Sequence, residues 1–427
     1  MKSLKRFLPE MPPMSAHERS VLVATCLGSL GSFYTMAVTG FALPQIQRGL
    51  AIPEEQVASL FALLRLGTIF SLVLAVAADR LGRRRLLIFS VAGCALCNIA
   101  TAFAQSGMAL AWLQLASRFF LGAQVLLSVV VVSEELSADN RGWGLGVLTA
   151  VSGMGGAVTL VVYMFVDYLP FGWRALFVVG GMGLLCVPWL WRSLQETQRF
   201  ADHQSQVAQA QAGEASGSQG HPLRDLVQLH GWRLVALMGV VIPVQIILEP
   251  GIIFVSKHLQ DDLAYSPAQV GILIGLAGIA TPVGNMVSGA VSDRFGRKPV
   301  TALMSLLLSA AVAIFYNATS LPLLALGLAL LFMSIGSLVV LHGALAAELF
   351  PTGFRSTAAG MREAFGTVGA SLGLWIVSLL YAFTGSHPAS ITWVLILTPI
   401  APLVVLLFVP ETARRELEEI APDDPGT

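Results

Sequence analysis

Twelve long apolar stretches follow one another along the 427-residue chain, and charged or turn-forming residues separate them. Each has about the 20 residues that an α-helix needs to cross the hydrocarbon of a bilayer. We expect membrane-spanning helices at residues 18–43, 56–78, 85–105, 108–134, 142–167, 172–192, 232–257, 267–291, 298–317, 321–348, 357–383 and 389–409. The first stretch exceeds the apolar core of a signal peptide and follows a basic flank, so we expect it to remain as a signal anchor.

The composition agrees with a multi-pass membrane protein. Hydrophobic residues make up 55% of the chain and charged residues 12%, too little polar surface for a soluble protein of this length. The formal net charge is zero, which gives no indication of a nucleic-acid partner. The cysteines, Cys26, Cys94, Cys97 and Cys186, all lie in apolar stretches, where we interpret them as packing residues and not as disulfides.

Lysine and arginine gather on one side of the predicted membrane. Basic residues precede the first span, follow spans 2, 4, 8 and 10, and occur at the centre and end of the chain, whereas the other side holds few besides Arg48, Arg174 and Lys257. Because loops that stay in the cytoplasm keep the positive charge, we expect both termini to be cytoplasmic. The expected location is the plasma (inner) membrane.

One basic turn occurs twice, as "DRLGRRRLL" from Asp79 and "DRFGRKPVT" from Asp293, 293 − 79 = 214 positions apart. Glu134 and Glu348 (348 − 134 = 214) and Arg141 and Arg355 (355 − 141 = 214) keep the same interval. The chain is therefore a duplication with six spans in each half, so both repeats have the same orientation. We expect bundles at 1–195 and 232–410, a Gln- and Ser-rich linker at 196–231 and a tail at 411–427. His203 and His221 in the linker are isolated and predict no metal site.

These motifs resemble those of major facilitator superfamily transporters. Residues 75–87, "AVAADRLGRRRLL", are similar to the family's turn between helices 2 and 3, although Ala75 replaces the usual glycine. "SRFFLGAQ" (117–124), with Arg118 and Gly122, resembles the family's helix 4 motif. The sugar-porter-like, organic-solute and aromatic-acid symporter branches are resembled by "VPETARRE" (409–416), by Glu134 with Arg141, and by Glu348 with Arg355. The resemblance covers the whole chain. It implies an all-α membrane protein of twelve helices in two parallel six-helix repeats, and a monomeric secondary transporter that needs no cofactor.

The same resemblance implies a gate on the cytoplasmic side. Asp79 ends a helix, where the helix dipole disfavours an anion, and the family compensates it with Arg83 and the start of helix 11. Arg362 and Glu363 in that helix project about 100° apart, so we expect them not to pair with each other. The predicted gate consists of Asp79, Arg80, Gly82, Arg83, Glu134, Arg141, Asp293, Arg294, Gly296, Arg297, Glu348, Arg355, Arg362 and Glu363.

Ionisable residues deep in the spans indicate the substrate site, because each is costly there unless it serves a purpose. Arg65, Arg118 and Glu249 stand near the middle of spans 2, 4 and 7, and His342 is a weaker candidate. Two arginines favour an anion, since a guanidinium binds a carboxylate with two hydrogen bonds. Alternatively, Arg118 is a structural residue that donates hydrogen bonds to backbone carbonyl groups. Arg65 alternatively lies near the outer mouth of the transport pathway, where its side chain extends to water. The predicted substrate-binding residues are Arg118, Arg65, Tyr34, Gln245 and Glu249.

Glu249 lies in "LEPGI", where Pro250 and Gly251 interrupt the helical hydrogen bonds. It either takes up a proton for coupling or neutralises Arg65 or Arg118. The acid that proton-coupled relatives carry in helix 1 is absent from "GSFYTMAVTG" (31–40). The best interpretation is a carrier of an organic anion or carboxylate, coupled to protons or not. An exporter of amphiphilic or cationic drugs and a passive uniporter stay open. The sequence shows no enzyme motif at one membrane face and predicts no metal site.

Overall fold

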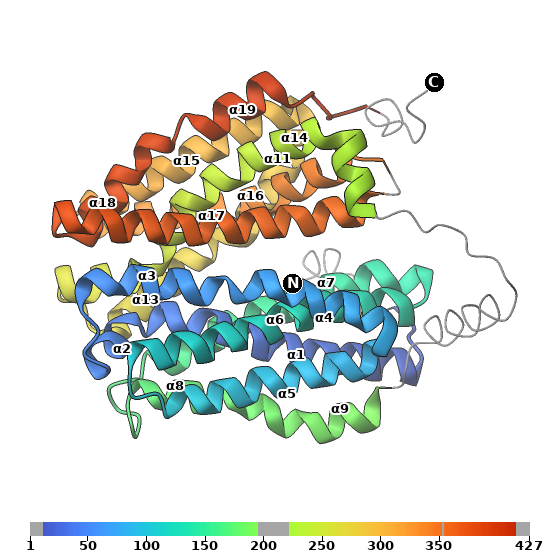
Figure 1. The fold of residues 1–427 in the computed structure, drawn as a ribbon, viewed down its shortest axis with the longest axis horizontal. Helices are drawn as coiled ribbons and strands as arrows, with labels where there is room; N and C mark the ends of the chain where they lie inside the picture. The colour runs from blue at the N-terminus through green and yellow to red at the C-terminus, as the bar shows by residue number, and fades with distance from the viewer. Residues whose placement is uncertain (1–11, 195–221, 352–353, 416–427) are drawn as a thin grey trace, which may run out of the picture.

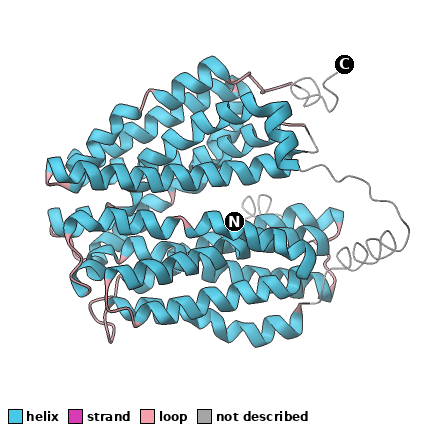
Figure 2. Ribbon diagram, viewed as in Figure 1, coloured by secondary structure: helices cyan, strands magenta, loops and turns pink. Residues whose placement is uncertain are grey.

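The computed structural model describes residues 12–194, 222–351 and 354–415, and the described chain consists of two bundles of helices (Figures 1 and 2). The first bundle contains α1 (Ala16–Phe41), α2 (Leu43–Gly49), α3 (Glu54–Arg65), α4 (Gly67–Leu81), α5 (Arg83–Ala102), α6 (Gly107–Glu135), α7 (Ala138–Tyr163), α8 (Trp173–Gly181), the 3₁₀ helix η2 (Met182–Cys186) and α9 (Val187–Ser193).

The second bundle repeats this order. It contains α11 (Pro222–Ile253), α12 (Val255–Lys257), the π-helical turn η3 (His258–Asp262), α13 (Pro267–Gly278), α14 (Ala280–Phe295), α15 (Arg297–Asn317), α16 (Leu321–Glu348), α17 (Arg355–Thr384), α18 (His387–Val394), η5 (Leu395–Leu397) and α19 (Ile400–Phe408). We call the end of the molecule where α9 ends and α11 begins the linker end, on the right of Figure 1, and the opposite end the distal end.

The expected spans and fold class are confirmed. Eleven helical segments in the described chain are long and apolar enough to cross a membrane. The remaining crossing is made by α3 and α4, which meet at Leu66. A Cβ added to Gly67, the first residue of α4, would lie 2.1 Å from the carbonyl oxygen of Leu115 on α6. The helix of this crossing is therefore interrupted where its backbone packs directly on α6, and the protein is an integral, multi-pass membrane protein.

The duplicated basic turn has the same backbone conformation in both halves. Gly82, between α4 and α5, has φ 99°, and Gly296, between α14 and α15, has φ 106°. Glycine adopts such angles without the steric penalty that a side chain brings. The two glycines are 296 − 82 = 214 positions apart, so the repeat that is visible in the sequence is also a repeat in local structure.

The apolar core is shared between the halves only toward the distal end. There, one cluster of buried side chains joins Val57 and Phe61 of α3 to Leu374 and Val377 of α17, and these two helices pack side by side (Figure 1). Toward the linker end each half has a cluster of its own, around Leu127, Val131 and Leu148 in the first half and Leu237, Val241 and Leu345 in the second. The halves are thus closed against each other at the distal end.

Helix α11 begins earlier than the sequence indicated. It starts at Pro222, inside the expected linker 196–231, and has a kink at His230 with φ −127° and ψ 22°. Leu226 in this first part is fully buried, which ties it to the second half and explains why it is ordered as helix. The rest of the linker, with His203 and His221, lies outside the described residues, so the boundaries of the halves stay predictions.

Candidate functional site

A buried ion pair joins the two halves at the level of the predicted substrate site. Arg65, the last residue of α3, donates from Nε to Oε1 of Glu249 on α11 over 2.7 Å, and its Nη2 donates to the other carboxylate oxygen. The side chain of Glu249 is 4% exposed and that of Arg65 17%. The fork of one guanidinium therefore covers the whole carboxylate, the arrangement in which Glu249 neutralises Arg65.

Arg118 on α6 lies beside this pair. Its Nη2 donates to the carbonyl oxygen of Met36 and to Oγ1 of Thr39, each over 3.2 Å, and the charges of Arg65 and Glu249 act on it. The tie to a backbone carbonyl, one of the two interpretations of Arg118, is present. Its buried Nε has no hydrogen-bond partner among the described residues, so the guanidinium keeps this donor for a further acceptor.

Tyr34 is held by contacts with α8. The Tyr34 hydroxyl donates to the carbonyl oxygen of Leu176 over 2.9 Å, and a Cβ on Gly180 would meet its ring at 3.2 Å. Both partners are on α8, so Tyr34 packs within the first half.

Two candidates of the second half have polar atoms without a hydrogen-bond partner in the part of the chain that the structure describes. Gln245 on α11 packs against Gly366 and Gly369 of α17, and its Oε1 is buried without a hydrogen bond. His342 on α16 is 4% exposed, and its Nε2 is likewise unpaired. Within the described chain, each therefore has a hydrogen-bonding group that no protein atom uses.

A polar network beside Arg118 was not foreseen from the sequence. Asn98 on α5 donates to Oγ1 of Thr35 over 2.7 Å, and Gln114 on α6 donates to Oγ1 of Thr101 over 2.9 Å. Asn98, Thr101 and Gln114 are each 1% exposed or less. Two amides within apolar spans are the sequence signal for this network, and a criterion based on ionisable groups alone does not detect them.

The distal end carries a polar seam between the halves, which we call the distal seam. Lys257 of α12 donates to Oε1 of Gln47 (2.7 Å), to Oε1 of Glu54 (3.0 Å) and to Oδ2 of Asp261 (2.7 Å). Ser256 donates to the carbonyl oxygen of Phe41 over 2.6 Å. One cation of the second half therefore binds two side chains of the first.

The same seam holds Glu54 in its charged form. Glu54 precedes the predicted span 56–78. Burial raises the pKa of its carboxyl group, but hydrogen bonds from Lys257 and Gln47, together with the positive charge of Lys257, outweigh burial and leave the pKa below its ordinary value. The Glu54–Lys257 contact is thus an ion pair at neutral pH.

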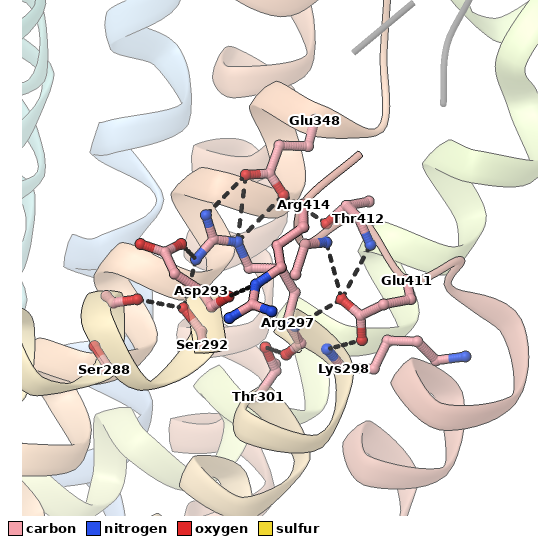
Figure 3. Close-up of polar contacts among 12 residues, drawn as sticks. Ser288, Ser292, Asp293, Arg297, Lys298, Thr301, Glu348, Glu411, Thr412 and Arg414 are labelled. Atoms are coloured by element: carbon pink, nitrogen blue, oxygen red, sulfur yellow. Dashed lines mark hydrogen bonds and ion pairs between the residues drawn. The ribbon is translucent and has the colours of Figure 1, made fainter. Parts of the chain in front are cut away.

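Three gate residues of the second half, Asp293, Arg297 and Glu348, form one network at the linker end (Figure 3). Arg297 Nη1 lies 2.7 Å from Oδ1 of Asp293, and Arg297 Nη2 lies 3.1 Å from Oε1 of Glu348. Glu411 accepts hydrogen bonds from the backbone N–H groups of Arg297 (2.7 Å) and Lys298 (3.2 Å), which are the first residues of α15. The tail motif therefore caps the helix that follows the basic turn.

The first half has the equivalent ion pair between Arg83 and Glu134. The side chains of Asp79 and Arg80 lie outside the described residues, and the Asp79–Arg83 contact stays a prediction. In the other repeat, Arg294 stacks on Phe295 with its Cζ 5.4 Å from the ring centroid. Arg141 has a buried Nε with no hydrogen-bond partner within the described ranges, whereas Arg355 donates from Nε to the carbonyl oxygen of Phe350 over 3.4 Å.

The expectation that Arg362 and Glu363 do not pair with each other is wrong. Arg362 Nη2 donates to Oε1 of Glu363. The side chains leave α17 in different directions, but arginine is long enough to bend around the helix surface, where the Glu363 side chain is 60% exposed. Among the described residues, no group of three or more histidines, cysteines, aspartates or glutamates is arranged to hold a metal ion.

Comparison with known proteins agrees with this architecture. The model of the Major Facilitator Superfamily matches residues 25–248 and 235–424. The chain is 27% identical to the gallate transporter of Pseudomonas putida over 84% of this chain and 85% of that protein. It is 28% identical to the 3-(3-hydroxy-phenyl)propionate transporter of Escherichia coli K12, over 84% of this chain and 87% of that one.

Solved structures show the same fold. A D-xylose-proton symporter matches with a TM-score of 0.73 at 17% identity, over 93% of this chain and 99% of the other. A bacterial homologue of the human lysosomal transporter Spinster, in an inward-facing conformation, also matches with a TM-score of 0.73, at 14% identity, over 93% and 98% of the two chains. The chain therefore belongs to the major facilitator superfamily, whose members that it matches are transporters and not enzymes, as its doubled basic turn indicates.

Proposed function

We propose that this chain carries a small organic anion with a carboxylate group, and that it does so by alternating access. The observation that supports this proposal is the meeting of Arg65, Arg118 and Glu249 at the interface between the halves, with two guanidinium groups and one carboxylate. The excess positive charge favours an anion there. Relatives named as transporters of gallate and of 3-(3-hydroxy-phenyl)propionate, both organic acids, favour the same class of substrate.

Glu249 supplies a route to proton coupling. While Glu249 is ionised it occupies the guanidinium of Arg65, so a substrate carboxylate has to compete with it. A proton on Glu249 removes that negative charge and releases Arg65 for the substrate. Proton and anion then bind cooperatively, because each favours the form of the site that the other needs. A passive uniporter differs in that its uptake is independent of the pH gradient.

The experiment that tests the anion site is a ligand-dependent thermal shift of the purified protein. Benzoate, hydroxybenzoates and short aliphatic monocarboxylates are compared with sugars and with lipophilic cations. We expect only the acids to stabilise the protein. Arg118→Lys keeps the charge but loses the planar fork, and should weaken acid binding by about 1 to 3 kcal/mol, or about 5- to 150-fold.

Arg174→Lys is the matched control. Arg174 also donates to a backbone carbonyl, that of Ala104 over 3.0 Å, but it lies at the start of α8, at the distal end of the first half. It should leave acid binding unchanged. Stabilisation by cations that is lost in Glu249→Gln and unaffected by Arg118→Lys would contradict the anion site and support the drug exporter.

We further propose that the linker end faces the cytoplasm and that the distal end faces the opposite side of the plasma (inner) membrane. We also propose that the protein acts as a monomer. The support is the concentration of basic residues at the linker end. A cysteine at Tyr168, a distal-end residue with 86% exposure, should react with an impermeant reagent on whole cells, and one at Ser216 only after lysis. The reverse pattern would invert the orientation.

The linker-end ion pairs are the proposed gate. The pairs Arg83–Glu134 and Arg297–Glu348 occupy equivalent places in the repeats, beside the two basic turns. Asp79→Asn is expected to leave the protein folded and to lower turnover more than ligand binding. Transport at the parent rate would show that Asp79 has no part in the gate.

A further inference from the structure

The distal seam contains a histidine that the transport site does not use. His387, the first residue of α18, is 6% exposed, and its Nε2 lies 3.1 Å from Oε2 of Glu54 on α3. The contact joins the two halves, so it breaks when the distal end opens. His387 also lines a pocket of about 340 Å³ together with Glu54, Lys257, Asp262 and Tyr381.

The surroundings of His387 fit a neutral imidazole. Nε2 donates its hydrogen to the carboxylate of Glu54, while Nδ1 is buried and has no hydrogen-bond partner in the part of the chain that the structure describes. A proton added at Nδ1 would create a buried, charged N–H group with no acceptor, which is costly. Opening the seam would give that N–H group water to bind.

The nearby charges do not offset this cost. Glu54 is already shared with Lys257, whose ammonium group lies 3.0 Å from its other oxygen. His387 also stands at the amino-terminal end of α18, where the helix dipole disfavours a cation. The ring of Phe254 stacks on the imidazole at a centroid distance of 4.6 Å, and that of Tyr381 lies at 4.4 Å.

The other ionisable groups around the pocket have partners of their own or lie farther along it. They are Asp261, bound to Lys257; His258, bound to Asp262 on the same helical turn; Tyr316, whose hydroxyl donates to the carbonyl of Gly251; and Glu55 of α3, which neighbours Tyr381. Asp262 also acts on His387 and favours its charge, but it is already bound to His258.

We propose that His387 is a proton-binding site of the distal seam, and that a proton on its Nδ1 opens the seam toward the distal side. The ligand is a proton from the distal compartment, and the state that it favours is the one in which Glu54 and His387 separate. This site is distinct from the Arg65–Glu249 pair and does not depend on which substrate is carried.

The test measures seam opening directly and without substrate. Spin labels at Tyr168→Cys in the first half and Phe383→Cys in the second occupy exposed distal positions, 86% and 88% exposed, and do not touch the seam contacts. Pulsed electron spin resonance then gives the fraction of molecules with a lengthened distance in lipid nanodiscs. The unsubstituted chain, in which the native cysteines are buried or half-buried, provides the labelling background.

We expect the open fraction to rise as the pH falls from about 8 to about 5. The rise is at most about tenfold for each unit of difference between the pKa of His387 with the seam open and its pKa with the seam closed. His387→Gln keeps a neutral N–H donor for Glu54 but binds no proton, so its open fraction should be low and independent of pH.

His258→Gln is the matched control, because His258 lines the same pocket but pairs with Asp262 within its own half. It should keep the pH dependence of the parent. A parent chain without pH dependence, a His387→Gln variant that responds like the parent, or a His258→Gln variant that loses the response would each overturn the proposal. None of these results depends on carboxylate binding, which the Arg118→Lys experiment tests separately.

Discussion

The buried pair between Arg65 and Glu249 makes a quantitative prediction about stability. Glu249→Gln removes the negative charge and leaves the guanidinium of Arg65 without its partner. Removal of one member of a buried ion pair costs about 3 to 5 kcal/mol. The Arg65 side chain is 17% exposed, so water reaches part of it, and we expect a loss of about 2.5 kcal/mol, just below that range.

Thermal unfolding of the purified variants in detergent, followed by tryptophan fluorescence, measures this loss. Each half has the size for which 1 kcal/mol shifts the midpoint by about 2 to 4 °C, so Glu249→Gln should melt about 5 to 10 °C lower than the parent. Glu363→Gln is the control, because Glu363 also pairs with an arginine but is 60% exposed. It should change the midpoint little.

The double variant Arg65→Gln/Glu249→Gln distinguishes the contribution of the ion pair to stability from the contributions of its two members. Two amides carry no buried charge, so part of the stability should return and the effects of the single changes should not add. A Glu249→Gln midpoint within about 1 °C of the parent, or strictly additive losses, would refute the view that the pair is buried and coupled.

Three further substitutions, and a fourth as a control, test individual contacts through the same unfolding midpoint. Gly336→Ala places a Cβ 2.2 Å from a backbone carbonyl oxygen of α14 and should cost about 1 to 3 kcal/mol, whereas Gly343→Ala, on the same helix with open space around it, should be neutral or stabilising. Glu411→Gln weakens the cap of α15 and should cost about 1 kcal/mol. Tyr34→Phe loses the hydrogen bond to Leu176 and should cost about 1 kcal/mol. We expect the affinity for substrate to stay unchanged, and a weakened affinity would show that Tyr34 belongs to the substrate site.

Several features followed from the sequence because their causes are local. The length of each apolar stretch determines whether it crosses a bilayer, whatever its neighbours are. The duplicated turn needs glycine at Gly82 and Gly296, and a repeat of 214 positions is visible without any structure. Acid and basic groups deep in spans are costly, which is why Arg65, Arg118 and Glu249 could be selected from the sequence before their contacts were known.

Other features depend on which helices face one another. The sequence left two roles open for Glu249, and only the packing of both α3 and α11 against α17 gives it Arg65 as a partner. The same is true of Tyr34, which turns toward α8, and of His387, whose carboxylate partner Glu54 lies 333 positions away. Burial and pairing of a polar group are properties of its three-dimensional neighbours. Hydrophobic length and repeat spacing determined the membrane fold, and tertiary packing alone decided which charges meet.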